Sequence, residues 1–70
     1  MACLPKAREV IQVVRQLGFS FVRQRGSHAI YRNNGTRITI PVHPGKEISP
    51  AVFRQILKDL NLTTKKFWQL

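Results

Sequence analysis

The stretch Arg23-Gln24-Arg25-Gly26-Ser27-His28-Ala29-Ile30-Tyr31-Arg32 predicts two β-strands joined at a glycine. Residues 19–24 are rich in aromatic and β-branched types, as strands are. The glycine permits a tight turn or bulge at which the chain reverses. Because side chains alternate between the two faces of a strand, His28 shares a face of the second strand with Arg32, whereas Tyr31 points to the other. An imidazole is therefore expected on the same face as a guanidinium.

An amphipathic helix is predicted before this stretch and another near the end of the chain. In the first, Pro5 suits the first turn and Gly18 suits the end. The second opens with Ser49 as N-cap and Pro50 as the first helical residue, and it ends near Asn61. Apolar residues at helical spacing are Ala7, Val10, Ile11, Val14 and Leu17 in the first helix and Val52, Phe53, Ile56, Leu57 and Leu60 in the second.

A third strand and a short C-terminal turn complete the expected elements. The Asn-Asn-Gly sequence at 33–35 is a strong hairpin signal, and residues 36–41 alternate apolar and polar types as a strand does. The segment 42–47 contains proline and glycine and is predicted to be a loop. Phe67 and Trp68 lie in a turn too short to be stable alone, so they are expected to pack back on the core.

The order helix, strand, strand, strand, helix predicts a single α+β domain over residues 1–70. Each helix has one apolar stripe to bury, so we expect a three-stranded antiparallel sheet with both helices on one face. Double-stranded-RNA-binding domains have this layout. The other face of the sheet is left open to solvent or to a partner.

The composition indicates a folded, strongly basic domain. Of the 70 residues 43% are hydrophobic, and 12 Lys and Arg against 3 acids give a net charge of +9. Such a charge favours a polyanionic partner, with nucleic acid as the first candidate. A single cysteine, no signal peptide and no apolar run long enough to span a bilayer predict a cytoplasmic protein without membrane contact.

The motifs and their spacing resemble the HicA family of toxin ribonucleases. The resemblance is carried by Arg25-Gly26-Ser27-His28, a following hairpin, Ile40-Pro41-Val42-His43-Pro44 and a helix opening Ile48-Ser49-Pro50, and it extends from the first helix to Leu62. It implies the same fold and an mRNA-cleaving toxin of a toxin–antitoxin pair. It also implies that His28 is catalytic and that a HicB-type antitoxin protein masks the active site.

The chemistry of the residues points to His28 as well. An imidazole can exchange a proton near neutral pH, and RNA supplies its own nucleophile in the 2′-hydroxyl, so a base and nearby cations suffice for cleavage. Arg23, Arg25 and Arg32 are expected to hold a phosphate beside it. The alternative is a histidine that only forms a hydrogen bond at the end of a strand.

Four further residues are weaker candidates. His43 is expected to be a second proton-transfer or phosphate-binding group, or else a surface residue of the loop. Ser27 is expected to bind the turn or a phosphate, since no acid near it in the chain completes a Ser-His-acid triad. Lys58, one turn after Arg54, either follows a phosphate backbone or is simply solvated. Tyr31 could stack on a base but is more often a core residue in such a strand.

No metal and no cofactor are expected. The three carboxylates, Glu9, Glu47 and Asp59, lie in three different segments, and two histidines are too few for a closed zinc site.

Two other functions fit the same predicted fold. A non-catalytic double-stranded-RNA-binding module usually grips the duplex with a Lys-rich start of its last helix, whereas residues 49–53 contain no lysine. A protein-interaction domain whose charge only confers solubility is also possible, but it leaves the face with His28 and Arg32 unexplained.

Overall fold

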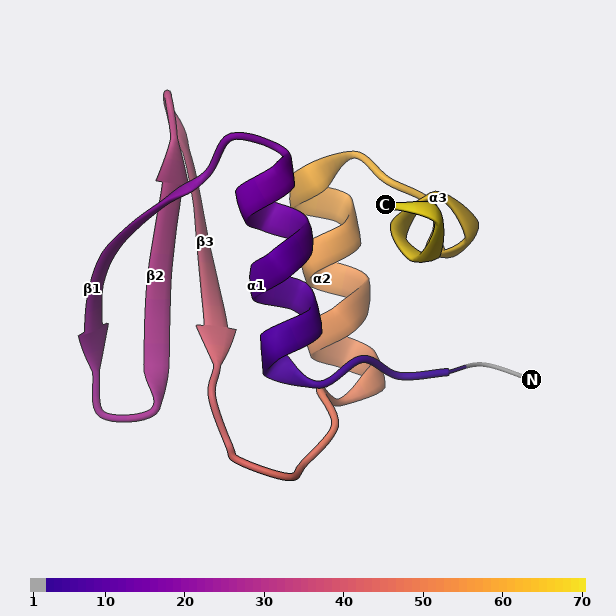
Figure 1. Cartoon of the computed structure of the whole chain (residues 1–70), viewed down its shortest axis with the longest axis horizontal. Coiled ribbons are helices and arrows are strands. Elements are labelled where there is room, and N and C mark those ends of the chain that lie inside the picture. Colours follow the sequence, from indigo (N-terminus) through magenta and orange to yellow (C-terminus); the bar gives the residue numbers. More distant parts are fainter. Residues whose placement is uncertain (1–2) are drawn as a thin grey trace.

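The computed structural model describes residues 3–70. The elements are α1 (Ala7–Gln16), β1 (Ser20–Arg25), β2 (His28–Asn33), β3 (Thr36–Pro41), α2 (Pro50–Leu60) and α3 (Thr64–Gln69). The strands form one antiparallel sheet in the order β1-β2-β3, and α1 and α2 lie together beside β3, so β1 is the strand furthest from them (Figure 1). The predicted α+β fold, with both helices on one face of a three-stranded antiparallel sheet, is confirmed.

Two tight hairpins set the register of the sheet. Arg25 pairs with His28, so only Gly26 and Ser27 turn the chain, and Gly26 has a φ of 58°. Between β2 and β3 the left-handed position is taken by Asn34, with a φ of 55°. Glycine adopts this conformation without cost and asparagine at little cost, which explains why both hairpin signals were informative.

One apolar layer fills the space between the sheet and the helices. The set of α1 residues in this layer differs from the prediction. Val13 is buried, whereas Ile11 and Leu17 are only half-buried at the edge of the layer. The sheet contributes the side chains that alternate toward the helices, and Tyr31 is among them, as its place in a strand suggested. The buried cluster comprises Ala7, Val10, Val13, Val14, Phe19, Ala29, Tyr31, Ile38, Ile40, Ile48, Phe53, Ile56, Leu57 and Phe67.

The ends of the helices follow local capping rules. The Ser49 hydroxyl accepts a hydrogen bond from the Val52 N–H (3.3 Å), and Asn61 ends α2 in the left-handed conformation, with a φ of 57°. The prediction for Pro5 was wrong, since α1 begins after the N-cap Lys6 and Pro5 precedes both. None of these helices, in the part of the chain that the structure describes, has the length and apolar character needed to cross a bilayer.

The segment before α1 is fastened to the loop before α2. The Ile48 N–H donates to the Pro5 carbonyl (2.7 Å), and Lys6 and Glu47 form an isolated antiparallel bridge. Because of this pairing, both helices begin at the same end of the molecule. The β1–β2 turn and the loop after β3 lie at that end too (Figure 1).

The short helix α3 is attached through Phe67. The Phe67 ring meets Phe53 edge to face with centroids 5.0 Å apart, and it meets Trp68 in the same way at 5.1 Å. Phe67 is 1% exposed and Trp68 is 41% exposed. The expected packing onto the core is therefore confirmed for Phe67, whereas Trp68 covers the core from outside.

We expect Phe67→Ala to lower the free energy of unfolding by about 3 kcal/mol or more, because a buried Phe loses its transfer energy and leaves a cavity. Trp68→Ala is the matched control and should cost clearly less, since much of that side chain is already in water. Urea denaturation followed by circular dichroism measures both. Equal losses for the two variants would contradict the assigned role of Phe67.

Candidate active site on the open face of the sheet

An irregularity in β1 decides which residues share the face that the helices leave uncovered. Phe21 pairs with Tyr31, whereas Arg23 pairs with the residue before Tyr31, so Val22 is an extra residue in a β-bulge. Phe21 therefore lies on the helix side, where the centroid of its ring is 5.6 Å from the centroid of the Tyr31 ring. Strict alternation from Phe21 would put Arg23 on the helix side too. The bulge instead places Arg23, and Arg25 two residues later, on the open face.

The open face consists of three cross-strand rows. Directly paired residues point to the same side of a sheet, and successive rows on one face are roughly 6.6 Å apart because side chains repeat every second residue. Each row contains one residue from each strand and at least one arginine. The rows are Arg25, His28 and Pro41; Arg23, Ile30 and Thr39; and Ser20, Arg32 and Arg37.

His28 occupies the middle of the first row. Its side chain is exposed, and within residues 3–70 we find no hydrogen bond that it makes. Directly opposite paired residues have Cα atoms about 4.5 to 5.5 Å apart, so Arg25 on β1 is an immediate neighbour. The imidazole is thus presented to solvent on the open face, which it shares with Arg32 as the alternation along β2 predicted.

The charge on this face is of one sign. The three acids of the chain lie in α1, in the loop before α2 and in α2, so no strand contains a carboxylate. Like charges in neighbouring positions of a sheet repel one another, and an anionic ligand would relieve this repulsion. The exposed arginines on the open face are Arg23, Arg25, Arg32 and Arg37.

Arg37 was not among the predicted site residues. Its position opposite Arg32 follows from the hairpin around Asn34, and counting back from that turn would have found it.

The loop after β3 lies against the β1–β2 turn. The Val42 N–H donates to the Ser27 carbonyl (2.6 Å), which brings His43 to the same end of the molecule as His28. Both imidazoles are exposed, and no hydrogen bond joins them among the described residues. Ser27 is half-buried, and its contact with the loop uses the backbone carbonyl.

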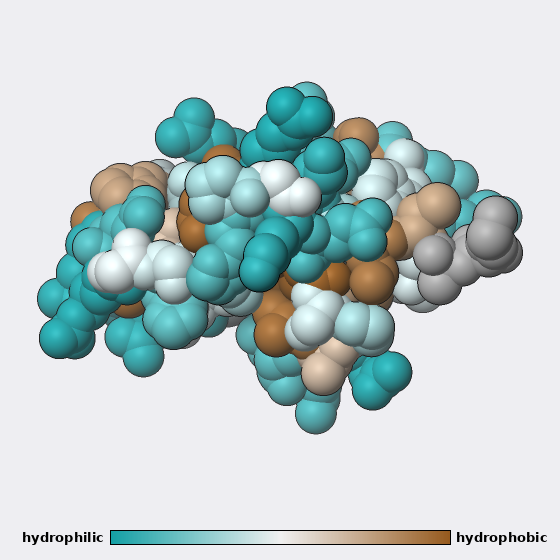
Figure 2. Space-filling view, turned by 90° about the horizontal axis from the view of Figure 1, so that it is seen from below, coloured by the Kyte–Doolittle hydropathy of each residue, from teal (hydrophilic) through white to brown (hydrophobic). Residues whose placement is uncertain are grey.

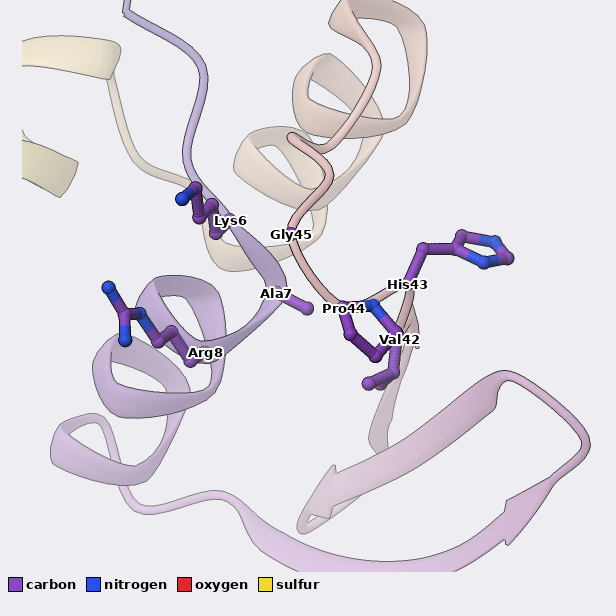
Figure 3. Close-up of a pocket in the computed structure, with 7 residues that line it drawn as sticks. All are labelled: Lys6, Ala7, Arg8, Val42, His43, Pro44 and Gly45. Carbon is purple, nitrogen blue, oxygen red and sulfur yellow. The ribbon is translucent and has the colours of Figure 1, made fainter.

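A cavity of about 360 Å³ separates this loop from the start of α1. Lys6, Arg8 and His43 are among the residues that line it, but their polar groups do not converge. Lys6 and Arg8 point to one side, whereas the imidazole of His43 points to the opposite side (Figure 3). The cavity therefore does not combine His43 with the two cations. Seen from this end, the molecule is largely covered by hydrophilic side chains, with hydrophobic surface showing between them (Figure 2).

The structure does not bring Lys58 to the face with His28. Lys58 is exposed in the last turn of α2, at the end of the helix away from the loop with His43. The helix turns its apolar stripe to the sheet, so its polar residues face away from it. Any RNA contact of Lys58 would thus lie on a different surface from Arg23, Arg25 and Arg32.

A comparison with protein-family models matches residues 7–62 to the HicA toxin of bacterial toxin–antitoxin systems. The chain belongs to the HicA toxin family. The match runs from the start of α1 past the end of α2, so it includes the hairpin with His28 and the loop with His43. A HicA toxin is one half of a toxin–antitoxin pair, so an antitoxin is its partner. Among curated proteins, no match to this chain is found.

We expect Gly26→Val to destabilise this HicA toxin by about 1 to 2 kcal/mol, because a β-branched residue resists the positive φ of the turn that connects Arg25 to His28. Gly26→Asn is the matched control and should cost less, since asparagine tolerates that conformation. Apart from the chain neighbours of Gly26, no heavy atom lies within 4 Å of an added Cβ, so both variants have room for that atom. Chemical denaturation of both variants tests this, and equal costs would contradict it.

Proposed function

We propose that this HicA toxin is a metal-independent endoribonuclease that cleaves mRNA on the open face of its sheet. The observation that supports this most is the placement of His28 and Arg25 in one row of a face that has four arginines and no carboxylate. A single RNA strand carries a phosphate at every nucleotide, so it is a suitable ligand for such a face.

His28 is the proposed general base. Its imidazole takes the proton of a ribose 2′-hydroxyl, and the oxygen attacks the adjacent phosphorus while the bond from phosphorus to the 5′-oxygen breaks. Guanidinium groups of Arg25 and Arg23 would stabilise the negative charge on the phosphoryl oxygens. The 5′ fragment then ends in a 2′,3′-cyclic phosphate, and the 3′ fragment begins with a 5′-hydroxyl.

His43 is proposed to protonate the leaving 5′-oxygen or to bind a neighbouring phosphate. Its support is the hydrogen bond from Val42 to Ser27, which holds its loop beside the turn that precedes His28. Ser27 and Arg32 are proposed phosphate contacts at the turn and further along β2. For Lys58 we propose contact only with RNA long enough to reach the helical layer.

This route needs proton transfer and positive charge but no metal ligand. Among residues 3–70, three or more His, Cys, Asp or Glu side chains do not gather at any one place. The arginines on the open face supply the positive charge that a divalent ion would otherwise bring.

The proposed antitoxin is a HicB-type protein that covers the open face with an acidic surface. Opposite charge speeds the encounter of two proteins and selects the right partner, and the net charge of +9 suits this. We propose that both proteins act in the cytoplasm, where mRNA is translated.

We expect His28→Ala to reduce RNA cleavage by a factor of about 10² to 10⁴, the usual contribution of a general base. The fold and the RNA affinity should change little, because the side chain is exposed and makes no hydrogen bond within the described residues. Cleavage of a labelled single-stranded RNA, circular dichroism and a binding titration measure the three properties, with Arg15→Gln as a control on α1.

Retained activity in His28→Ala would rule out its role as base, and an unfolded variant would indicate a structural role. Binding of duplex RNA by the unaltered protein without any cleavage would favour the alternative of a double-stranded-RNA-binding module.

The ends of the products should also identify the mechanism. We expect a 2′,3′-cyclic phosphate, or the 3′-phosphate formed by its hydrolysis, and a 5′-hydroxyl, with activity unchanged in excess EDTA. DNA should remain intact, and a 2′-deoxy nucleotide before the cut should prevent cleavage there. Mass spectrometry distinguishes these ends from a 5′-phosphate and a free 3′-hydroxyl lost with EDTA, which would indicate metal-activated water.

A further inference from the structure

We propose that Arg32 and Arg37 form a second phosphate site, which binds a phosphate of the RNA strand other than the one that is cut at His28. The two arginines are direct cross-strand partners on the open face and both are exposed. Together with Gly35 they line an open hollow of about 440 Å³ at the β2–β3 end of the sheet. The proposal rests on the ribonuclease function proposed above and adds a site that positions its substrate.

Two arginines directly opposite each other in a sheet are an unfavourable pair without an anion. Paired Cα atoms lie about 4.5 to 5.5 Å apart, and like charges directly opposite one another destabilise a sheet. No carboxylate of the three strands can neutralise them, because residues 20–41 contain no Asp or Glu. A phosphate can accept hydrogen bonds from both side chains, which provides the missing negative charge.

The hairpin also holds one of these side chains in place. The Arg32 Nε–H donates to the Asn34 carbonyl (3.2 Å), which holds the guanidinium beside the turn and leaves its terminal NH₂ groups available. Apart from the chain neighbours of Gly35, no heavy atom lies within 4 Å of the position that a Cβ would occupy there, so the surface beside Gly35 is open. A partly fixed donor loses less conformational entropy when it binds.

The spacing along β2 separates this site from the catalytic row. His28 and Arg32 lie on the same face four residues apart, which corresponds to roughly 13 Å along a strand. One phosphate cannot bridge that distance, so the arginine pair would hold a different phosphate of the same strand. The row with Arg23, Ile30 and Thr39 lies between the two sites. RNA that extends across all three rows should therefore be the better substrate.

The experiment combines a protein variant with changes at single phosphates of the substrate. A ten-nucleotide single-stranded RNA with one cleavage site is prepared with a neutral methylphosphonate at one position at a time. For the unaltered toxin we expect one position away from the cut at which neutralisation lowers kcat/KM by about tenfold, as loss of a charge-assisted hydrogen bond would. In Arg37→Gln this sensitivity should disappear, while that variant lowers kcat/KM on unmodified RNA by a similar factor.

Arg15→Gln, which removes the same charge from α1, is the matched control and should keep the sensitivity. Affinity for an uncleavable 2′-O-methyl RNA gives a second measurement that does not depend on catalysis. Its logarithmic dependence on salt should become shallower by about 0.7 in Arg37→Gln and stay unchanged in Arg15→Gln. The thermal midpoint of Arg37→Gln should be no lower than that of the unaltered toxin, since a repulsive pair is removed.

The outcomes separate the two proposals. If Arg37→Gln keeps full affinity, full kcat/KM and the sensitivity to every phosphate, the second site is overturned while the ribonuclease remains supported. Unchanged RNA kinetics with weaker inhibition by the antitoxin would assign the pair to the protein partner and would also overturn the site. If the unaltered toxin binds RNA but never cuts it, and the salt dependence of binding still becomes shallower in Arg37→Gln, only the ribonuclease is overturned. A thermal midpoint of Arg37→Gln below that of the unaltered toxin would show that the two arginines do not repel each other, which would remove the argument for a bound anion.

Discussion

The burial of one face of the sheet beneath two helices is the constraint on which the remaining structure depends. Ala29, Tyr31, Ile38 and Ile40 occupy that face, and burial of the two isoleucine side chains alone contributes about 1.5 to 3 kcal/mol each. Because neighbouring side chains point to opposite faces, this choice sends His28 and the arginines to the other side. Repulsion between paired arginines costs at most about 1 kcal/mol, so packing decides the arrangement and the charged face follows from it.

The edge position of β1 makes the arrangement of the proposed active site possible. The helices lie furthest from this strand, and Phe21 and Val22 remain 50% and 51% exposed. A central strand would lose hydrogen bonds on both sides at a bulge, whereas an edge strand has only one neighbour to satisfy. The extra residue lets Phe21 stay over Tyr31 while Arg23 and Arg25 face outward. The same strand thus packs Phe21 against the ring of Tyr31 and presents Arg23 and Arg25 to the proposed RNA surface.

Long-range backbone pairing assembles the end of the molecule at which His28 lies. The bond from Val42 to Ser27 joins the loop after β3 to the first hairpin, and the bond from Ile48 to Pro5 joins that loop to the start of α1. Both helices consequently direct the positive ends of their dipoles toward this end. The proposed catalytic row is therefore the part of the open face closest to additional positive potential, which suits a polyanionic substrate that carries its own nucleophile.

Much of this molecule could be predicted from local sequence. Hydrophobic periodicity gave the helices and strands, the turn residues gave both hairpins, and alternation along β2 placed His28 and Arg32 on one face. Each of these depends on residues within a few positions of one another, so short-range rules are sufficient. The motif around His28 was likewise local, and it led to the family that the comparison confirmed.

Only the tertiary structure decided how distant segments combine. A bulge at Val22 lets Phe21 lie on the helix side while Arg23 and Arg25 face outward, and it reflects competition between the packing of Phe21 and the register set by the turn. The place of His43 near Ser27, and the separation of Lys58 from His28, follow from contacts between elements far apart in the chain. Such contacts depend on the packing of the whole domain, and no periodicity within a single segment encodes them.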